Sequence, residues 1–466
     1  MAKHTAPVEK NETITLNFED LTHEGNGVGK INGYPLFVPQ ALPGEEGEVK
    51  VVKVNKNFGF GKLLELTKES PDRIEPVCHV HCNGCGLQHM SYSLQLEMKQ
   101  NQVKNAMKKI AHLEHVPVKS IIGMDDPLHY RNKVQIPVGE KNGELITGFY
   151  QKRSHRIIEN TETCVTHNEV INDVVKSVRD ITNRLGIKAY NEQEHNGVLR
   201  HIMVRTGEET KDIMVVLVTR TDKLPHQDEL VKELTSEFPH IKSVVHNVNH
   251  KRTNVIMGDK SKVIWGDEYI HDKIGEITFA ISAKSFYQVN PAQTRKLYDK
   301  ALEYADIGTK DTVIDAYCGI GTISLFMAQK ARKVYGVEVV PEAISDAKKN
   351  AKLNGITNAE FYVGEAEKVM PWWKMQGLNP DVIVVDPPRK GCDEELLKAM
   401  TEMQPKRIVY VSCNPSTLAR DLRVLEDRGY ATQEVQPVDM FPQTGHVECC
   451  ALIERVKDYA VGSENL

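Results

Sequence analysis

A cysteine and a glutamate near the C-terminus have the residue types needed for nucleophilic and base catalysis. Cys413 lies in SCNPSTLARD, where an apolar run ends and a helical stretch begins. A thiol near a helix N-terminus has a lowered pKa, which favours the thiolate; a small buried cysteine is the alternative. Glu448 begins the last apolar run, in HVECC. If that run is an antiparallel strand, both side chains reach the same sheet edge, where the carboxylate can act as a base.

A glycine-containing segment, DAYCGIGT at 315–322, closes one expected strand and opens an expected helix. Gly319 and Gly321 allow the backbone to approach a ligand at the helix N-terminus. A dinucleotide fingerprint would have a third glycine where this chain has Ser324. Glu338 ends the next strand and can accept hydrogen bonds from ribose hydroxyls. The pattern favours an adenosyl ligand over NAD; a glycine turn that serves packing alone is the alternative.

A third motif, DPPRKG at 386–391, follows the fourth apolar run. Ligands of open α/β sheets bind at the carboxyl ends of strands, so we expect Asp386 to face the same crevice as Gly319. Two prolines can also simply end a strand. Together with Cys413 and Glu448, this crevice suits methylation of uracil at C5. A thiolate that adds to C6 makes C5 nucleophilic, and a base then removes the C5 proton.

Strand-like runs alternate with helical stretches from Asp311 onward, which predicts an α/β fold with a doubly wound, Rossmann-like parallel sheet. The runs cover 312–317, 333–339, 360–364, 381–388 and 407–412. Two further runs, 431–441 and 446–456, are joined by the short loop PQTG and can therefore pair only antiparallel. This arrangement is the sheet signature of an adenosylmethionine-dependent methyltransferase.

The N-terminal part of the chain has a different pattern. Residues 11–66 contain short, evenly spaced apolar runs between Gly and Pro turns, which predicts a small β-barrel. In its last run, lysines flank Phe58 and Phe60, a pattern that suits single-stranded nucleic acid, although a half-buried strand with solvated lysines is the alternative. The lysines are Lys50, Lys53, Lys56 and Lys62. We expect a helix at about 91–113 and a mixed α+β domain up to about 280.

In chain order, SFYQVNP, DAYCGIGT, DPPRKG, SCNPSTLARD and HVE resemble the RNA uracil-5-methyltransferase family, which modifies uridines in 23S rRNA and tRNA. The resemblance extends over nearly the whole chain. It implies a TRAM-type RNA-binding barrel at 1–70, a central domain with iron–sulfur cysteines at 71–280, and a methyltransferase domain at 281–466, on which the helix near 91–113 packs.

The resemblance also implies roles for individual residues. Cys413 would be the nucleophile and Glu448 the proton acceptor. S-adenosyl-L-methionine would be the methyl donor, contacted by Gln288, Tyr317, Glu338 and Asp386. The RNA would be 23S rRNA in preference to tRNA, on resemblance alone, with the target uridine in a loop or flipped from its stack because a duplex hides the ring.

Three cysteines, Cys78, Cys82 and Cys85, lie within eight residues. In a chain without a secretion signal, this crowding indicates a metal or cluster site in place of disulfides. The family resemblance implies a [4Fe–4S] cluster with Cys164 as fourth ligand, since thiolates are the expected cluster ligands. Tetrahedral zinc is the alternative. The first two cysteines are closer together than is usual in the family, so a neighbouring histidine could intrude at Cys78.

Two other classes of protein share part of this pattern. The C-x3-C-x2-C spacing also occurs in radical-adenosylmethionine enzymes, some of which carry a TRAM domain and modify tRNA. Three features argue against that class. Gly84 stands where an aromatic residue is usual, and Cys164 would be a fourth ligand on the iron that radical chemistry needs to keep open. The C-terminal sheet also supplies a separate adenosyl site. A non-catalytic iron–sulfur RNA-binding protein is disfavoured by the pairing of Cys413 with Glu448.

Length and composition limit the remaining choices. At roughly 150 residues per domain, 466 residues correspond to about three domains. Apolar residues make up 40% and charged residues 26%, which excludes collagen-like and largely disordered chains. The start lacks an apolar segment and no run is long enough to span a membrane, so we expect a cytoplasmic monomer without membrane or protein partners. The net charge of −5 gives no global basic field, so RNA binding would depend on local patches.

Overall fold

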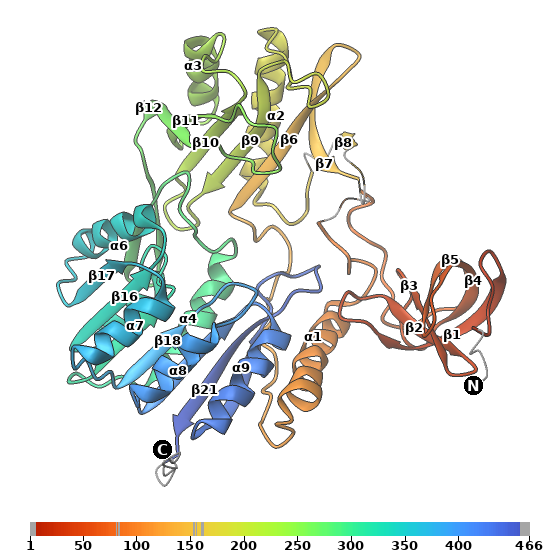
Figure 1. The fold of residues 1–466 in the computed structure, drawn as a ribbon. Helices are drawn as coiled ribbons and strands as arrows, with labels where there is room; N and C mark the ends of the chain where they lie inside the picture. The colour runs from red at the N-terminus through yellow and green to blue at the C-terminus, as the bar shows by residue number, and fades with distance from the viewer. Residues whose placement is uncertain are drawn as a thin grey trace.

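The computed structural model describes residues 6–80, 82, 84–151, 154, 156–159 and 163–456. It contains a closed five-stranded barrel, two seven-stranded sheets and a two-stranded hairpin, with helices packed on the sheets. Figure 1 shows the barrel at one side of the molecule, next to α1, and the C-terminal sheet at the other. Within the described residues, no helix is both long and apolar enough to cross a membrane.

The barrel closes in the order β1-β2-β3-β5-β4. Its side chains alternate between interior and exterior: Val49 and Val51 are buried, whereas Lys50 is exposed. Leu16 and Leu36 complete the interior. The predicted small barrel is thus confirmed. Its strands are β1 (Thr13–Leu21), β2 (Gly27–Ile31), β3 (Tyr34–Val38), β4 (Glu46–Val54) and β5 (Gly59–Lys68).

The central sheet has the order β12-β11-β10-β9-β6-β7-β8 and is antiparallel except for the β10–β11 pair. Helices α2 (Glu169–Arg184) and α3 (Gln227–Glu237) cover one face through a buried aliphatic cluster. This agrees with the mixed α+β pattern expected for the middle of the chain. The strands are β6 (Lys133–Lys141), β7 (Glu144–Tyr150), β8 (Ile157–Glu159), β9 (Leu199–Thr206), β10 (Ile213–Thr219), β11 (Ile241–Val248) and β12 (Lys260–Gly266).

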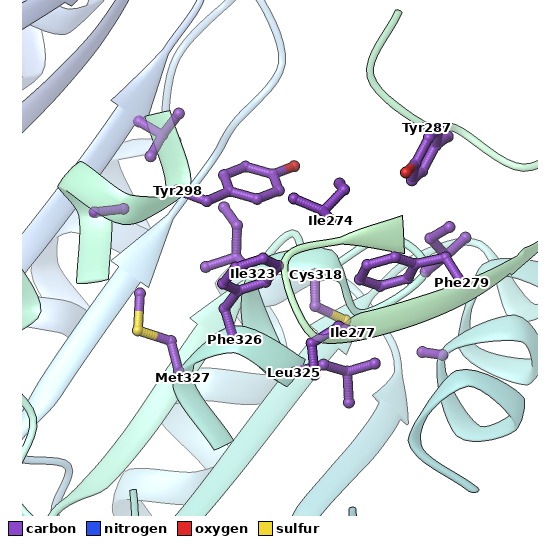
Figure 2. Packing of buried hydrophobic residues seen from close by; sticks show 14 of the residues in the cluster. Ile274, Ile277, Phe279, Tyr287, Tyr298, Cys318, Ile323, Leu325, Phe326 and Met327 are labelled. Carbon is purple, nitrogen blue, oxygen red and sulfur yellow. The ribbon is translucent and has the colours of Figure 1, made fainter. Parts of the chain in front are cut away.

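A hairpin of β13 (Ile270–Ile274) and β14 (Ile277–Ile281) joins the two large sheets. It shares one hydrophobic cluster with Met203 and Met214 of the central sheet and with the first helices of the C-terminal sheet. Figure 2 shows Phe279 of the hairpin beside Cys318, which is buried in this cluster. Cys318 is therefore a packing residue.

The C-terminal sheet has the order β17-β16-β15-β18-β19-β21-β20 and is parallel except for β21. The predicted doubly wound α/β sheet and its antiparallel last pair are both confirmed. Parallel β18 and β19 are buried almost throughout because helices cover both faces. The strands are β15 (Thr312–Ala316), β16 (Lys333–Glu338), β17 (Ala359–Val363), β18 (Val382–Val385), β19 (Arg407–Ser412), β20 (Tyr430–Val438) and β21 (Glu448–Arg455).

The helices of this sheet divide between two hydrophobic clusters, one on each face. The first cluster holds α4 (Pro291–Ala305), α5 (Thr322–Ala328) and α6 (Pro341–Leu353). The second holds α7 (Ala366–Met375), α8 (Glu394–Glu402) and α9 (Pro415–Asp427).

A helix from the N-terminal half of the chain also packs on the C-terminal sheet. The predicted helix at 91–113 is α1 (Tyr92–Ala106), capped by Ser91, and it continues as a π-helical turn, η1 (Met107–Ala111). Val103 and Met107 belong to the same hydrophobic cluster as α9, and α1 lies beside α9 (Figure 1). This packing brings the segment that follows the cysteine cluster close to the last two strands.

Candidate active site

The structure brings all six side chains proposed for catalysis or donor binding onto one cavity of about 1040 Å³. The cavity lies at the carboxyl ends of β15, β16, β18 and β19, where open α/β sheets bind ligands. The start of β21 reaches the same edge because this strand runs antiparallel. The six residues are Gln288, Tyr317, Glu338, Asp386, Cys413 and Glu448.

The glycine segment after β15 forms one wall of this cavity. Gly319 and Gly321 have φ values of +54° and +83°, in the left-handed region that glycine adopts without strain. The Gly319 N–H donates to Glu338 Oε2 at 3.3 Å, and the Val340 N–H donates to Glu338 Oε1 at 3.0 Å. These bonds orient the Glu338 carboxylate at the end of β16, with lone pairs left over for ligand hydroxyls.

Asp315, at the start of the same motif, was not singled out from the sequence. Its Oδ2 accepts a hydrogen bond from Ser324 Oγ at 2.5 Å, while its Oδ1 is buried and has no hydrogen-bond partner among the described residues. Burial raises the pKa of Asp315 to about 7. A buried carboxylate with one unsatisfied oxygen on a cavity wall is suited to a cationic or hydrogen-bond-donating ligand. In the sequence, the only signal for Asp315 is its place at the start of DAYCGIGT. Its burial, which gives it a special role in the structure, cannot be predicted from the sequence pattern.

Cys413 and Glu448 come together through the register of two neighbouring strands. Ser412 of β19 is the partner of Cys449 of β21, so the next opposing pair is Cys413 and Glu448. Both side chains line the cavity. Burial, with the charge of Asp386 adding to it, raises the pKa of Glu448 to about 8. A carboxyl group whose pKa lies near neutral pH is suited to proton transfer.

The lowered thiol pKa expected from the position of Cys413 before α9 is wrong for the unliganded site. Burial, with the charges of the nearby Glu448 and Asp386 adding to it, raises the pKa of Cys413 to about 11. Arg389 opposes this shift. Desolvation and two carboxyl groups therefore outweigh the helix terminus, so the thiol needs a change in its surroundings before it can ionise.

The cavity has further lining residues, and four of them have side chains that sequence reasoning did not select. Phe286 is 71% exposed and lies two residues before Gln288. Arg389 follows Asp386 in DPPRKG. Phe441 and His446 pack edge to face, with ring centroids 6.2 Å apart. Three of the four residues lie inside the motifs SFYQVNP, DPPRKG and HVE, and this position could have identified them from the sequence. Phe441 lies in none of these motifs, so no sequence signal identified it.

The four cysteines of the proposed cluster site also come together. Burial raises the pKa of Cys85 to about 12, and the charges of the other three thiols contribute. The Val80 and Gly84 N–H groups donate to the sulfurs of Cys78 and Cys82 at 3.4 and 3.3 Å. Among the described residues, however, no three His, Cys, Asp or Glu side chains are arranged as ligands of one metal ion. His79 faces Glu75, and His81 lies outside the described residues.

Two models of known protein families match the chain. Residues 91–456 match the family model described as tRNA (uracil-5-)-methyltransferase, and residues 7–64 match the model of the TRAM domain. The chain belongs to the tRNA (uracil-5-)-methyltransferase family. The chain is therefore an RNA methyltransferase with an N-terminal TRAM barrel.

Relatives of this chain match it over nearly their whole length. An uncharacterized RNA methyltransferase of Oceanobacillus iheyensis is 70% identical over 97% of this chain and 98% of its own. One from Listeria monocytogenes is 52% identical over 96% and 98% of the two chains. Among solved structures, the tRNA (uracil-54, C5)-methyltransferase of Pyrococcus abyssi in complex with S-adenosyl-L-homocysteine has a TM-score of 0.76. It is 28% identical and covers 94% of this chain and 100% of its own.

Proposed function

We propose that this enzyme transfers a methyl group from S-adenosyl-L-methionine to C5 of a uridine in RNA through a covalent bond between Cys413 and C6. The observation that carries this proposal is the β19–β21 register, in which Ser412 opposes Cys449, so that Cys413 and Glu448 face each other on the cavity. A nucleophile and a base that lie side by side at one edge of the cavity suit attack on a ring followed by removal of its proton.

The chemistry assigns one step to each side chain. The Cys413 thiolate adds to C6, and the electron pair of the C5–C6 double bond moves toward C5 and O4. C5 then forms a bond to the methyl carbon of S-adenosyl-L-methionine while the bond from that carbon to the sulfonium sulfur breaks, and S-adenosyl-L-homocysteine is the leaving group. Glu448 removes the C5 proton, the electrons of that C–H bond restore the double bond, and the C6–S bond breaks to release the thiolate. Burial raises the pKa of Glu448 to about 8, so the ionised side chain is a stronger base than an ordinary carboxylate.

The residues on the other side of the cavity fit the methyl donor. The Glu338 carboxylate can accept from ribose hydroxyls, and the unpartnered Oδ1 of Asp315 can accept from a charged amino group. We assign Gln288, Tyr317 and Asp386 to the same ligand. When bound, S-adenosylmethionine supplies the methyl group, and its positive sulfonium would favour ionisation of the Cys413 thiol. Arg389 contributes in the same direction.

The barrel supports RNA as substrate. Phe37 joins Phe58 and Phe60 in a surface cluster whose ring centroids lie 5.6, 5.8 and 5.7 Å apart. Phe58 is exposed and the other two rings are half-buried, and accessible rings beside lysines can stack on unpaired bases while the cations meet phosphates. We propose 23S rRNA as the RNA, with the target uridine unpaired or flipped. This preference rests on sequence resemblance; tRNA, which is in the name of the family model and of the Pyrococcus structure, is the competing substrate.

We further propose that Cys78, Cys82, Cys85 and Cys164 hold a [4Fe–4S] cluster. The electrostatic influence of these cysteines on one another indicates that they are neighbours, and the sulfurs of Cys78 and Cys82 accept N–H···S hydrogen bonds; both observations support a group shared by the four side chains. A cubic cluster spreads its ligands over four iron atoms, so it does not require three donors to converge on one ion, as tetrahedral zinc would. A fourth cysteine ligand and a separate donor cavity also weigh against radical-adenosylmethionine chemistry.

The chain is proposed to divide into a TRAM barrel at 1–70, a central domain at 71–280 and a methyltransferase domain at 281–466. The closed barrel and the two separate large sheets support this division, while α1 belongs by packing to the C-terminal sheet. We propose that the enzyme acts as a cytoplasmic monomer on RNA, without a membrane or protein partner.

The test is mass mapping of total RNA from cells whose only copy of the gene carries Cys413→Ala. We expect one or more 5-methyluridines to disappear while other modifications stay, and the RNA that loses them identifies rRNA or tRNA as substrate. Complementation with the wild-type gene restores them. If every 5-methyluridine persists in the Cys413→Ala strain, the proposed function is wrong.

A further inference from the structure

The loop between β20 and β21, residues 439–447, carries side chains into the cavity and ends at Glu448. Phe441 and His446 line the cavity from this loop. Gln443, between them, has a φ of +69°, a backbone conformation that strains a residue other than glycine. Such a conformation persists only when its surroundings hold it. The contacts of this loop therefore bear on the position of Glu448.

Five consecutive backbone carbonyl groups of the loop, those of residues 439–443, accept hydrogen bonds from segments distant in sequence. The side chains of α1, α4 and the segment before β6 supply four donors, and backbone N–H groups supply the rest. In order along the loop the donors are Gln293 Nε2, Asn290 Nδ2, Lys99 Nζ and Tyr130 Oη, each at 3.0 Å, and then the N–H groups of Gly86 and Leu87 at 3.0 and 3.1 Å.

Gln95 on α1 hydrogen-bonds both the side-chain oxygen and the backbone N–H of the strained residue. Gln95 is 1% exposed; its Nε2 donates to Gln443 Oε1 and its Oε1 accepts from the Gln443 N–H, both at 3.0 Å. The same Nε2 donates to the carbonyl groups of Leu87 and Met90 at 3.2 Å. One buried amide thus joins α1, the loop and the segment directly after Cys85.

The geometry points to Gln95 and Gln443 as positioning residues, whose reciprocal hydrogen bonds hold the 439–447 loop so that Glu448 faces Cys413. Through Gly86 and Leu87, they also link the place of Glu448 to the cysteine-bearing segment. The inference rests on the proposed function, because it concerns the step in which Glu448 takes the C5 proton and the C6–S bond breaks. Cys413 lies on a different element, before α9, so its addition to C6 depends less on this loop.

The consequence is a specific kinetic signature. If the loop shifts, removal of the C5 proton slows more than formation of the bond between Cys413 and C6, so the covalent protein–RNA adduct accumulates. A purely structural role would instead lower the amount of folded enzyme and leave the adduct fraction of the folded enzyme unchanged. The adduct fraction therefore separates positioning from folding.

The test compares Gln95→Ala, Gln443→Ala and Gln443→Gly with Asn101→Ala, an exposed residue of the same helix. Each full-length protein, checked for folding by thermal unfolding, is mixed with S-adenosylmethionine and an RNA that the wild type methylates. We expect the two alanine variants at Gln95 and Gln443 to turn over about 10- to 100-fold more slowly, with a larger adduct fraction on denaturing gels. Gln443→Gly should retain more turnover than Gln443→Ala, because glycine accepts a φ of +69°.

Two results overturn the inference: turnover and adduct fraction in Gln95→Ala equal to those of Asn101→Ala, or slower turnover without adduct accumulation in the folded variants. If Gln95→Ala does not fold, the comparison of Gln443→Gly with the wild type decides the question alone. If the wild type forms 5-methyluridine on neither rRNA nor tRNA, so that no such RNA can be found, the proposed function is refuted and not the contacts of the loop.

Discussion

Ser412 and Cys449 are direct partners in the antiparallel pairing of β19 with β21. The residues one step beyond this pair, Cys413 and Glu448, therefore oppose each other at the cavity. Because side chains alternate along a strand, a slip of one residue in this register would turn Glu448 to the other face of the sheet. The covalent mechanism that we propose depends on this single register.

Replacing the proposed base should trap the reaction after methyl transfer. Glu448→Gln keeps the size of the side chain but cannot take the C5 proton, so we expect turnover to fall by roughly 10²- to 10⁴-fold. A methylated protein–RNA adduct should accumulate, visible on denaturing gels and by mass spectrometry. The double variant Cys413→Ala, Glu448→Gln should form none. Repeated turnover by Glu448→Gln would remove Glu448 from the base role.

The raised pKa of Glu448 predicts how the stability of the unliganded enzyme changes with pH. Burial raises this pKa from 4.5 to about 8, so the folded state holds a proton that the unfolded state releases in this window. The contribution of Glu448 to the free energy of unfolding is full below pH 4.5 and is lost as the pH rises toward 8. Glu448→Gln removes this loss, so the variant should gain stability relative to the wild type as the pH rises.

Urea unfolding at about pH 5 and about pH 8.5, without ligand, measures this difference. Glu342→Gln, on the same cavity and without such burial, is the matched control. The same free-energy difference between Glu448→Gln and the wild type at both pH values would contradict the buried, protonated state of Glu448.

The aromatic cluster of the barrel should contribute to RNA affinity and leave the chemical step alone. Loss of one stacked base costs about 1–3 kcal/mol, so Phe58→Ala should weaken the Kd for a single-stranded RNA substrate by about 5- to 150-fold. Turnover at saturating RNA should stay near that of the wild type. Val52→Ala, an exposed apolar residue of the same barrel, is the control. Unchanged affinity, measured by fluorescence anisotropy at fixed salt, would remove the cluster from the RNA-binding surface.

Replacing cluster cysteines should cause loss of iron while the C-terminal sheet stays folded. Protein purified without oxygen should contain about four iron atoms per chain, and Cys82→Ser and Cys85→Ser should lose most of them together with their visible absorbance. Cys392→Ala, a buried cysteine outside the group, should keep its iron. We expect weaker turnover in the serine variants because Gly86 and Leu87 bind the loop that leads to Glu448. Retained folding, RNA binding and turnover would argue against any role of the cysteines.

Much of the architecture was predictable because local patterns determine it. The alternation of apolar runs with helical stretches predicts the parallel sheet, and the four residues PQTG are too few for a crossover, so β21 had to run antiparallel. Strand ends then bring Asp386, Cys413 and Glu448 to one edge without any knowledge of side-chain packing. The barrel followed from short runs between turns in the same way.

The sequence by itself therefore determined which elements form and which edge of the sheet carries the reactive side chains, because both depend on residue spacing along the chain. Only the tertiary structure decided the pKa of Cys413, since burial and the carboxyl groups of Asp386 and Glu448 outweigh the helix terminus. Tertiary structure also decided the support of the 439–447 loop, whose hydrogen-bond donors come from positions between 86 and 293. Burial and hydrogen-bond partners depend on segments distant in sequence, and spacing carries no record of them.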